Sequence, residues 1–148
     1  MLRIQAIDMD MLITAMEISD TFEAQWWLDP TSGQVEMTGQ DVDDSLPEDE
    51  LEEHGAVPIP PVDSHRGYRD MKDFIATLDD EQVRAVLSHA LDGKRPFRHF
   101  KDAVYTYPKV RDGWYAFHQK RMRHHAITWL LAEGLVDRTE AQRALDED

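Results

Sequence analysis

The residues best suited to binding chemistry are bases that stand beside aromatic side chains. Arg98, His99 and Lys101 are interleaved with Phe97 and Phe100. Lysine and arginine contact phosphate oxygens and aromatic rings stack on bases, so this cluster suits a nucleic-acid surface. At helical spacing, however, the same pattern is typical of a helix that buries its aromatic side and exposes its basic side to water. The second interpretation is favoured.

Four further bases and one tryptophan extend the candidate surface. Arg121 and Arg123 lie in the middle of a long predicted helix, and Arg66 and Arg69 lie on an earlier one. Strand alternation places Trp27 on the more polar face of a predicted hairpin, where a helix covers it or a partner binds it. The sequence therefore predicts an interaction surface made of Trp27, Arg66, Arg69, Arg98, His99, Lys101, Arg121 and Arg123.

Patterns typical of catalytic or metal sites are weak. The sequence contains no glycine-rich nucleotide loop, P-loop, nucleophile elbow or His-Glu-x-x-His motif. His118 and His125 share a helix face and Asp63 precedes His65, but neither pair has a third ligand at metal spacing. The acidic pair 79–80 is explained by solvation and helix capping. With 0 cysteines, thiol catalysis and disulfides are excluded. We expect no metal and no cofactor, and enzymatic activity is the least favoured function.

Charge is distributed unevenly along the 148 residues. Residues 1–63 hold 16 acids and one base, whereas residues 64–136 hold 9 acids and 13 bases, within a chain of net charge −14. The two parts attract each other, or one of them binds an outside partner. Helical neighbours are expected to neutralise some bases, as Arg98 with Asp102 and Arg69 with Asp73. Because of its total charge, the protein is expected to bind nucleic acid weakly at physiological salt.

Length and hydropathy indicate a soluble globular protein. A chain of 148 residues fits one domain over 1–148. Residues 41–53 carry eight acids and no base, so we expect a solvated acidic loop over about 39–56. We also expect an acidic C-terminal helix over 137–148. The first residues lack the basic start and apolar stretch of a signal peptide, and no apolar run approaches a membrane span. A cytoplasmic location is expected.

Strand alternation predicts a small sheet in the first half. Apolar and polar residues alternate on both sides of the turn residues 29–33, which predicts a β-hairpin. Its expected inner face carries Phe22, Trp26, Leu28, Val35 and Met37. Val57 and Ile59 alternate with prolines, which cannot donate to a ladder, so an edge strand is expected there. Alternation over residues 2–6 predicts a short strand at most.

Helical periodicity dominates the rest of the chain. Asp8 is predicted to open an early helix, and Asp63-Ser64 precedes a second one over about 64–78. Asp79 is predicted to cap a third helix, whose apolar face includes Val86 and which Gly93 ends. A short helix between Pro96 and Pro108, a long helix from Pro108 to Gly134 and a final helix capped by Asp137 with Glu140 follow. The predicted fold class is α+β: a small antiparallel sheet, made of the N-terminal hairpin plus an edge strand, followed by a mostly helical C-terminal half.

Three ordered blocks of the chain resemble a bacterial family, the uncharacterised protein family number 0158. The blocks are WLDPTSGQV at 27–35, IPPVDS at 59–64 with Tyr68, Met71 and Phe74, and FRHFKD at 97–102 with Pro108, Trp114, Phe117, Arg121 and Trp129-Leu130. His99 stands where the family pattern has arginine. The resemblance covers residues 6–136 and implies one α+β domain, but it brings no activity and no catalytic residue.

Three functions remain open at this point. The first is an interaction module that binds a protein partner or itself, and a continuous apolar patch including Trp27 would favour it. The second is a nucleic-acid-binding accessory protein, which a continuous basic surface would favour. The third and least favoured is an enzyme, which would need a deep pocket with convergent polar groups.

Overall fold

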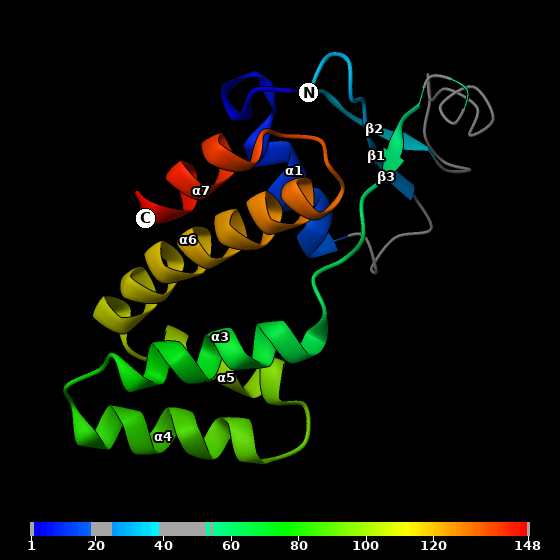
Figure 1. The fold of residues 1–148 in the computed structure, drawn as a ribbon. Helices are drawn as coiled ribbons and strands as arrows, with labels where there is room; N and C mark the ends of the chain where they lie inside the picture. The colour runs from blue at the N-terminus through cyan, green and yellow to red at the C-terminus, as the bar shows by residue number, and fades with distance from the viewer. Residues whose placement is uncertain (1, 19–24, 39–52, 54, 148) are drawn as a thin grey trace. The chain divides into compact units, whose positions relative to one another are not determined.

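The computed structural model describes residues 2–18, 25–38, 53 and 55–147, and these form a small sheet and a set of helices (Figure 1). In chain order the elements are η1 (Ile4–Ala6), α1 (Met9–Ile18), β1 (Gln25–Leu28), β2 (Val35–Thr38), β3 (Val57–Pro58), α3 (Ser64–Ala76), α4 (Glu81–Asp92), α5 (Pro96–Tyr105), α6 (Pro108–Ala132) and α7 (Arg138–Asp146). The predicted α+β class is confirmed.

The chain divides into two compact units. Unit 1 comprises Met1–Val62 and Met122–Asp148, and unit 2 comprises Asp63–Arg121. The long helix α6 therefore contributes its first part to unit 2 and its last part to unit 1. The expectation of one domain over 1–148 stays a prediction.

The sheet of unit 1 has three antiparallel strands in the order β2-β1-β3, as Figure 1 shows. In the hairpin Trp26 pairs with Met37 and Leu28 with Val35. These residues contribute to the unit 1 core, so the predicted inner face is confirmed for them; Phe22 lies outside the described residues. Among the strands that the structure describes, β3 pairs with β1 alone, so the predicted edge strand is also confirmed.

Trp27 lies on the hairpin face opposite Trp26 and pairs with Glu36, as the alternation predicts, and of the two outcomes left open for it the side chain is covered. Trp27 is 5% exposed and Trp26 is 7% exposed, although neighbours on a strand point to opposite faces. The strand β1 is the central strand, and Trp27 pairs with both Glu36 and Pro58. The low exposure of both tryptophans shows that both faces of the sheet are covered at this point.

The predicted short strand over residues 2–6 is replaced by the 3-10 helix η1. The amides of Ala6 and Ile7 donate to the carbonyls of Arg3 and Ile4. Leu2 forms a single bridge with Val136. Alternation failed here because Leu2, Ile4 and Ile7 are all buried, which a 3-10 turn achieves as well as a strand does. Asp8 then accepts from the Met11 amide at 3.2 Å, which confirms it as the start of α1.

The core of unit 1 is formed by α1, the sheet, the end of α6 and α7. Its fully buried members include Leu12, Leu28, Ile127 and Leu130. The hairpin loop approaches η1 closely, because the Asp8 amide donates to the Gly33 carbonyl at 3.1 Å. Gly33 has a φ of 78°, which glycine adopts without strain.

Unit 2 packs four helical segments around an aromatic core. The rings of Phe100 and Phe74 lie edge-on to Trp114, with centroids 5.0 and 5.4 Å away. Asp63 caps α3 by accepting from the His65 amide, as the sequence indicates. The helix α4 is capped by Asp80 rather than the predicted Asp79, because its side chain reaches the amides of Gln82 and Val83.

Two further predictions concern Val86 and the acidic loop. Val86 is exposed, contrary to its predicted place on the apolar face of α4. The buried stripe of this helix consists of Val83, Leu87 and Leu91, whose spacing of four residues places them on one side. The acidic loop expected over about 39–56 lies largely outside the described residues. No helix among the described residues is both long and apolar enough to cross a membrane.

Candidate functional site

A stripe of exposed side chains follows the outer face of α5. Arg98, Lys101 and Tyr105 are exposed and lie three and four residues apart, so they share one side of this helix. Phe100 is 0% exposed and belongs to the core. The favoured interpretation of the cluster around Arg98, an aromatic side buried and a basic side in water, is thus confirmed for Phe100 and for the exposed bases.

A pair of exposed tyrosines extends this stripe onto α6. Tyr105 and Tyr115 are 55% and 46% exposed, and the Tyr115 hydroxyl donates to the Tyr105 hydroxyl at 2.8 Å. Their rings lie edge to face with centroids 6.5 Å apart. The hydrogen bond to Tyr105, with partial desolvation, raises the pKa of Tyr115 above the ordinary tyrosine value. We call Arg98, Lys101, Tyr105 and Tyr115 the α5 stripe.

The two bases of the α5 stripe lack a carboxylate partner among the described residues. The expected pair of Arg98 with Asp102 does not form, although both side chains are exposed at i and i+4. An exposed pair of this kind gains little in water, because solvation of both charges competes with their attraction. Both positive charges therefore stay available to a partner.

The start of α5 lies beside the start of α3, which carries Arg66. A Cβ added to Gly67 would lie 3.2 Å from the ring of Phe97. The exposed bases Arg66 and Arg98 each adjoin one of these two contacting residues in the sequence. The residue before α5, Arg95, adopts a φ of 53° and gives no side-chain cap to the helix. The predicted candidates Arg69 and His99 are also exposed in unit 2.

Arg121 is engaged by two carboxylates of α3. Its Nη1 lies 3.2 Å from Asp73 Oδ2 and 3.9 Å from Oδ1 of Asp70, which is only 4% exposed. The guanidinium also lies over the Phe117 ring at 4.9 Å. A carboxylate buried to this extent needs a counter-charge, so Asp70 and Asp73 engage Arg121. Asp73 therefore does not pair with Arg69 as predicted.

The residues of the predicted surface are divided between the two units. Trp27 and Arg123 belong to unit 1, whereas the other six candidates belong to unit 2. Trp27 is buried, as described above. Arg123 is half-buried and lines a cleft within unit 1.

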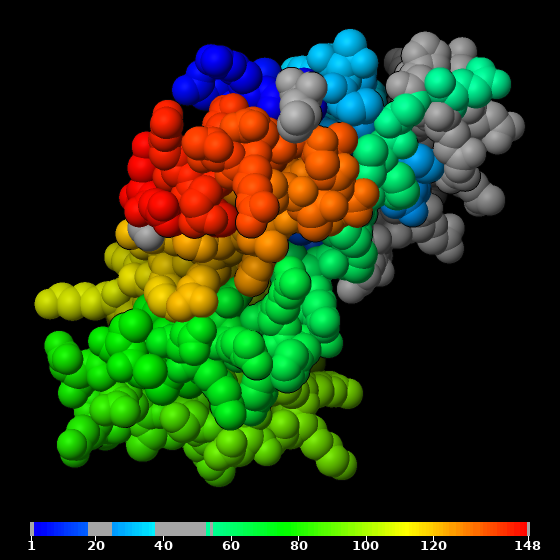
Figure 2. Space-filling view, viewed as in Figure 1, coloured from blue at the N-terminus to red at the C-terminus, as the bar shows by residue number. Residues whose placement is uncertain are grey.

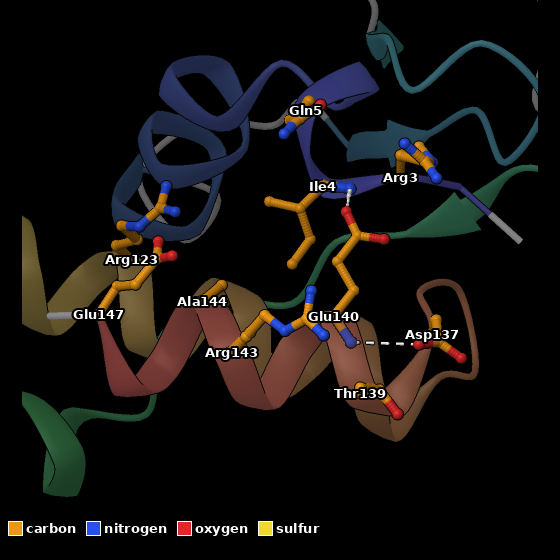
Figure 3. Close-up of a pocket in the computed structure, with 10 residues that line it drawn as sticks. All are labelled: Arg3, Ile4, Gln5, Arg123, Asp137, Thr139, Glu140, Arg143, Ala144 and Glu147. Atoms are coloured by element: carbon orange, nitrogen blue, oxygen red, sulfur yellow. Dashed lines mark hydrogen bonds between the residues drawn. The ribbon is translucent and has the colours of Figure 1, made fainter.

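This cleft lies between the first residues of the chain and α7 and has a volume of about 470 Å³ (Figure 3). Figure 2 shows these two segments, blue and red, adjoining on one face of unit 1. A hydrogen bond joins them, because the Ile4 amide donates to Glu140 Oε1 at 2.9 Å. Polar side chains dominate the cleft wall, among them Arg3, Gln5 and Arg143.

Comparison with known proteins matches the chain to one family over most of its length. The model of the Uncharacterised protein family (UPF0158) matches residues 3–146. The chain belongs to this family. A UPF0158 protein of Pseudomonas aeruginosa is 30% identical over 133 residues, which cover 87% of this chain and 84% of the relative. No solved structure matches this UPF0158 protein.

The sequence analysis did not identify several residues of the α5 stripe and of the cleft between η1 and α7 in this UPF0158 protein. Tyr105 shares the helical spacing of Arg98 and Lys101, so the sequence does carry a signal for it. The placement of Arg3 and Arg143 on one cleft left no local signal, because it depends on contact between two segments far apart in the sequence. Within the described ranges, no group of three or more His, Asp or Glu side chains is arranged to hold a metal ion.

Proposed function

We propose that this UPF0158 protein is a binding module, rather than an enzyme, that recognises an acidic segment of a partner protein through the α5 stripe. The observation that supports the proposal is the placement of two exposed bases and two exposed tyrosines on one continuous side of unit 2. The interaction is proposed to take place in the cytoplasm, in line with the sequence-based expectation.

The chemistry of these side chains suits a protein interface. Tyrosine and arginine are enriched among the residues that contribute most binding energy at such interfaces. The hydroxyl bond between Tyr105 and Tyr115 restricts both rings before a partner arrives, which lowers the entropy lost on binding. Because Arg98 and Lys101 have no carboxylate partner among the described side chains, a partner's carboxylates gain attraction without breaking an existing pair.

Nucleic acid is a second candidate partner. Its supporting observation is that Tyr105 is exposed beside Lys101, so its ring is accessible for stacking on a base. Two features oppose it: Phe100 is fully buried, and the chain carries a net charge of −14. We therefore expect dissociation constants no tighter than about 10⁻⁴–10⁻⁶ M at physiological salt. Fluorescence anisotropy with labelled RNA, single-stranded DNA and duplex DNA measures them.

Affinity purification with a matched pair of variants tests the proposed function. The test variant carries Arg98→Glu and Lys101→Glu, and the control carries Arg84→Glu and Lys120→Glu, which reverse two exposed bases elsewhere in unit 2. Tagged proteins are recovered from cells of the source organism, and both protein and nucleic acid are quantified. We expect a protein that co-purifies with wild type and control but falls at least about tenfold with the test variant. Equal recovery of the partner protein with wild type, test variant and control contradicts the proposal. Loss of co-purifying RNA instead of protein in the test variant also contradicts it.

A further inference from the structure

We propose that the cleft between η1 and α7 binds a small anion with at least two carboxylate or phosphate groups, held by Arg3 and Arg143. This site lies within unit 1 and is separate from the α5 stripe of unit 2. The proposal therefore goes beyond the protein-binding function and does not depend on it.

The bases of unit 1 are concentrated at this cleft. Unit 1 contains four arginines and no lysine, and three of the arginines, at positions 3, 123 and 143, line the cleft. Only Arg138 lies elsewhere. Three carboxylates, Asp137, Glu140 and Glu147, line the same cleft, so its charges balance in a unit that is otherwise strongly acidic, and recognition of an anion rests on the individual guanidinium groups.

Two of the three carboxylates that line the cleft hold backbone amides, and none forms an ion pair with Arg3 or Arg143 among the described residues. Glu140 Oε1 accepts from the Ile4 amide at 2.9 Å, and Asp137 Oδ2 accepts from the Glu140 amide at 3.1 Å as the cap of α7. Figure 3 shows both bonds and shows the Glu147 carboxylate pointing toward Arg123. Arg3 and Arg143 have no carboxylate partner within the described part of the chain, and both are exposed to solvent.

The shape of the cleft and the chemistry of arginine identify the class of ligand. A volume of about 470 Å³ is that of a small-molecule site. The planar guanidinium donates two parallel hydrogen bonds to a carboxylate or phosphate group. Arg3 precedes η1 on one wall and Arg143 lies on α7 on the other, as Figure 3 shows. A ligand with an anionic group at each end can engage one arginine on each wall.

Calorimetric titration of the full chain tests this site with defined probes. Citrate represents polycarboxylates, glycerol 1,3-bisphosphate represents phosphate esters, and glycerol is the uncharged control. We expect saturable binding of at least one anion, weakened about tenfold or more by Arg3→Gln and by Arg143→Gln. Arg138→Gln removes the one arginine of unit 1 that does not line the cleft and is expected to bind as wild type does. The anion that binds more tightly identifies the source of the recognised groups.

A second readout keeps the test independent of stability. Arg143→Lys preserves charge and helix but lacks the planar fork, so its affinity is expected to fall while its melting temperature stays unchanged. In NMR titrations, the resonances of the Ile4 amide and of the Nε–H groups of Arg3 and Arg143 are expected to shift as anion is added, until the site is saturated. Absence of saturable binding by either anion up to about 10 mM, or equal weakening in Arg138→Gln, overturns the proposal.

Discussion

The hydroxyl of Tyr115 stays protonated to higher pH because it donates to Tyr105, which raises the pKa of Tyr115. Tyr105→Phe removes the acceptor, so the pKa of Tyr115 is expected to fall back toward the ordinary value of about 10. A raised pKa in the folded state means that the associated stability is present below the unfolded-state pKa and is lost as pH rises through the folded-state pKa. Ultraviolet titration of phenolate absorbance measures the change. Phe97→Leu, which leaves the pair intact, should not alter this titration, and an unchanged curve in Tyr105→Phe contradicts the account.

The two neighbouring tryptophans of β1 are buried on opposite faces of the sheet. Trp26→Ala and Trp27→Ala are therefore each expected to lower the free energy of unfolding by about 3–5 kcal/mol. Denaturant melts of the two variants measure these losses. A loss below about 1 kcal/mol for Trp27→Ala would show that this side chain is solvated.

Among the elements, the hairpin loop is held to η1 through Gly33. A Cβ at this position would meet the Ala6 carbonyl oxygen, and the φ of 78° disfavours any other residue. Gly33→Ala is expected to destabilise the protein by at least about 1–3 kcal/mol, because strain and overlap add. Gly93→Ala is the control, since a Cβ there meets nothing within 4 Å. Thermal melts in which both substitutions have the same effect would contradict this contact.

The start of α4 offers a test at the resolution of one residue. Asp80 accepts from the amides of Gln82 and Val83 at 2.9 and 3.3 Å. Asp80→Ala should therefore cost about 0.5–2 kcal/mol in the free energy of unfolding, whereas Asp79→Ala should cost much less. Chemical denaturation of both variants decides between the two caps, and a larger loss in Asp79→Ala would restore the sequence-based assignment.

Sequence patterns predicted the elements of this fold better than their surroundings. Periodicity identified the hairpin, the edge strand and the helices α3 to α7, because each element is encoded by its own local spacing of apolar residues. The sequence left open whether Trp27 is covered, and the form of residues 2–6 was predicted wrongly. Leu2 bridges to the distant Val136, a contact that no local pattern encodes.

At the scale of the whole molecule, the sequence shows how charge is distributed along the chain but does not show which charged side chains form ion pairs. The contrast between an acidic first part and a basic later part is a matter of composition. Which bases form ion pairs depends on their neighbours in three dimensions. Arg121 pairs with Asp70 and Asp73, whereas Arg98 and Lys101 are exposed to water. The candidate surface was therefore predictable residue by residue on α5 only, and Arg3 and Arg143 were beyond prediction.

Site-specific photo-crosslinking in cells tests the central claim, recognition of a partner protein by the α5 stripe, most directly. A photoreactive amino acid replaces Tyr105 in one strain and the exposed Val86 of α4 in another, so that both probes lie in unit 2. The account predicts a discrete protein adduct from position 105, weak or absent from position 86, and lost when Arg98→Glu and Lys101→Glu are added. Equal adducts from both positions, or crosslinks from position 105 to nucleic acid alone, would contradict it.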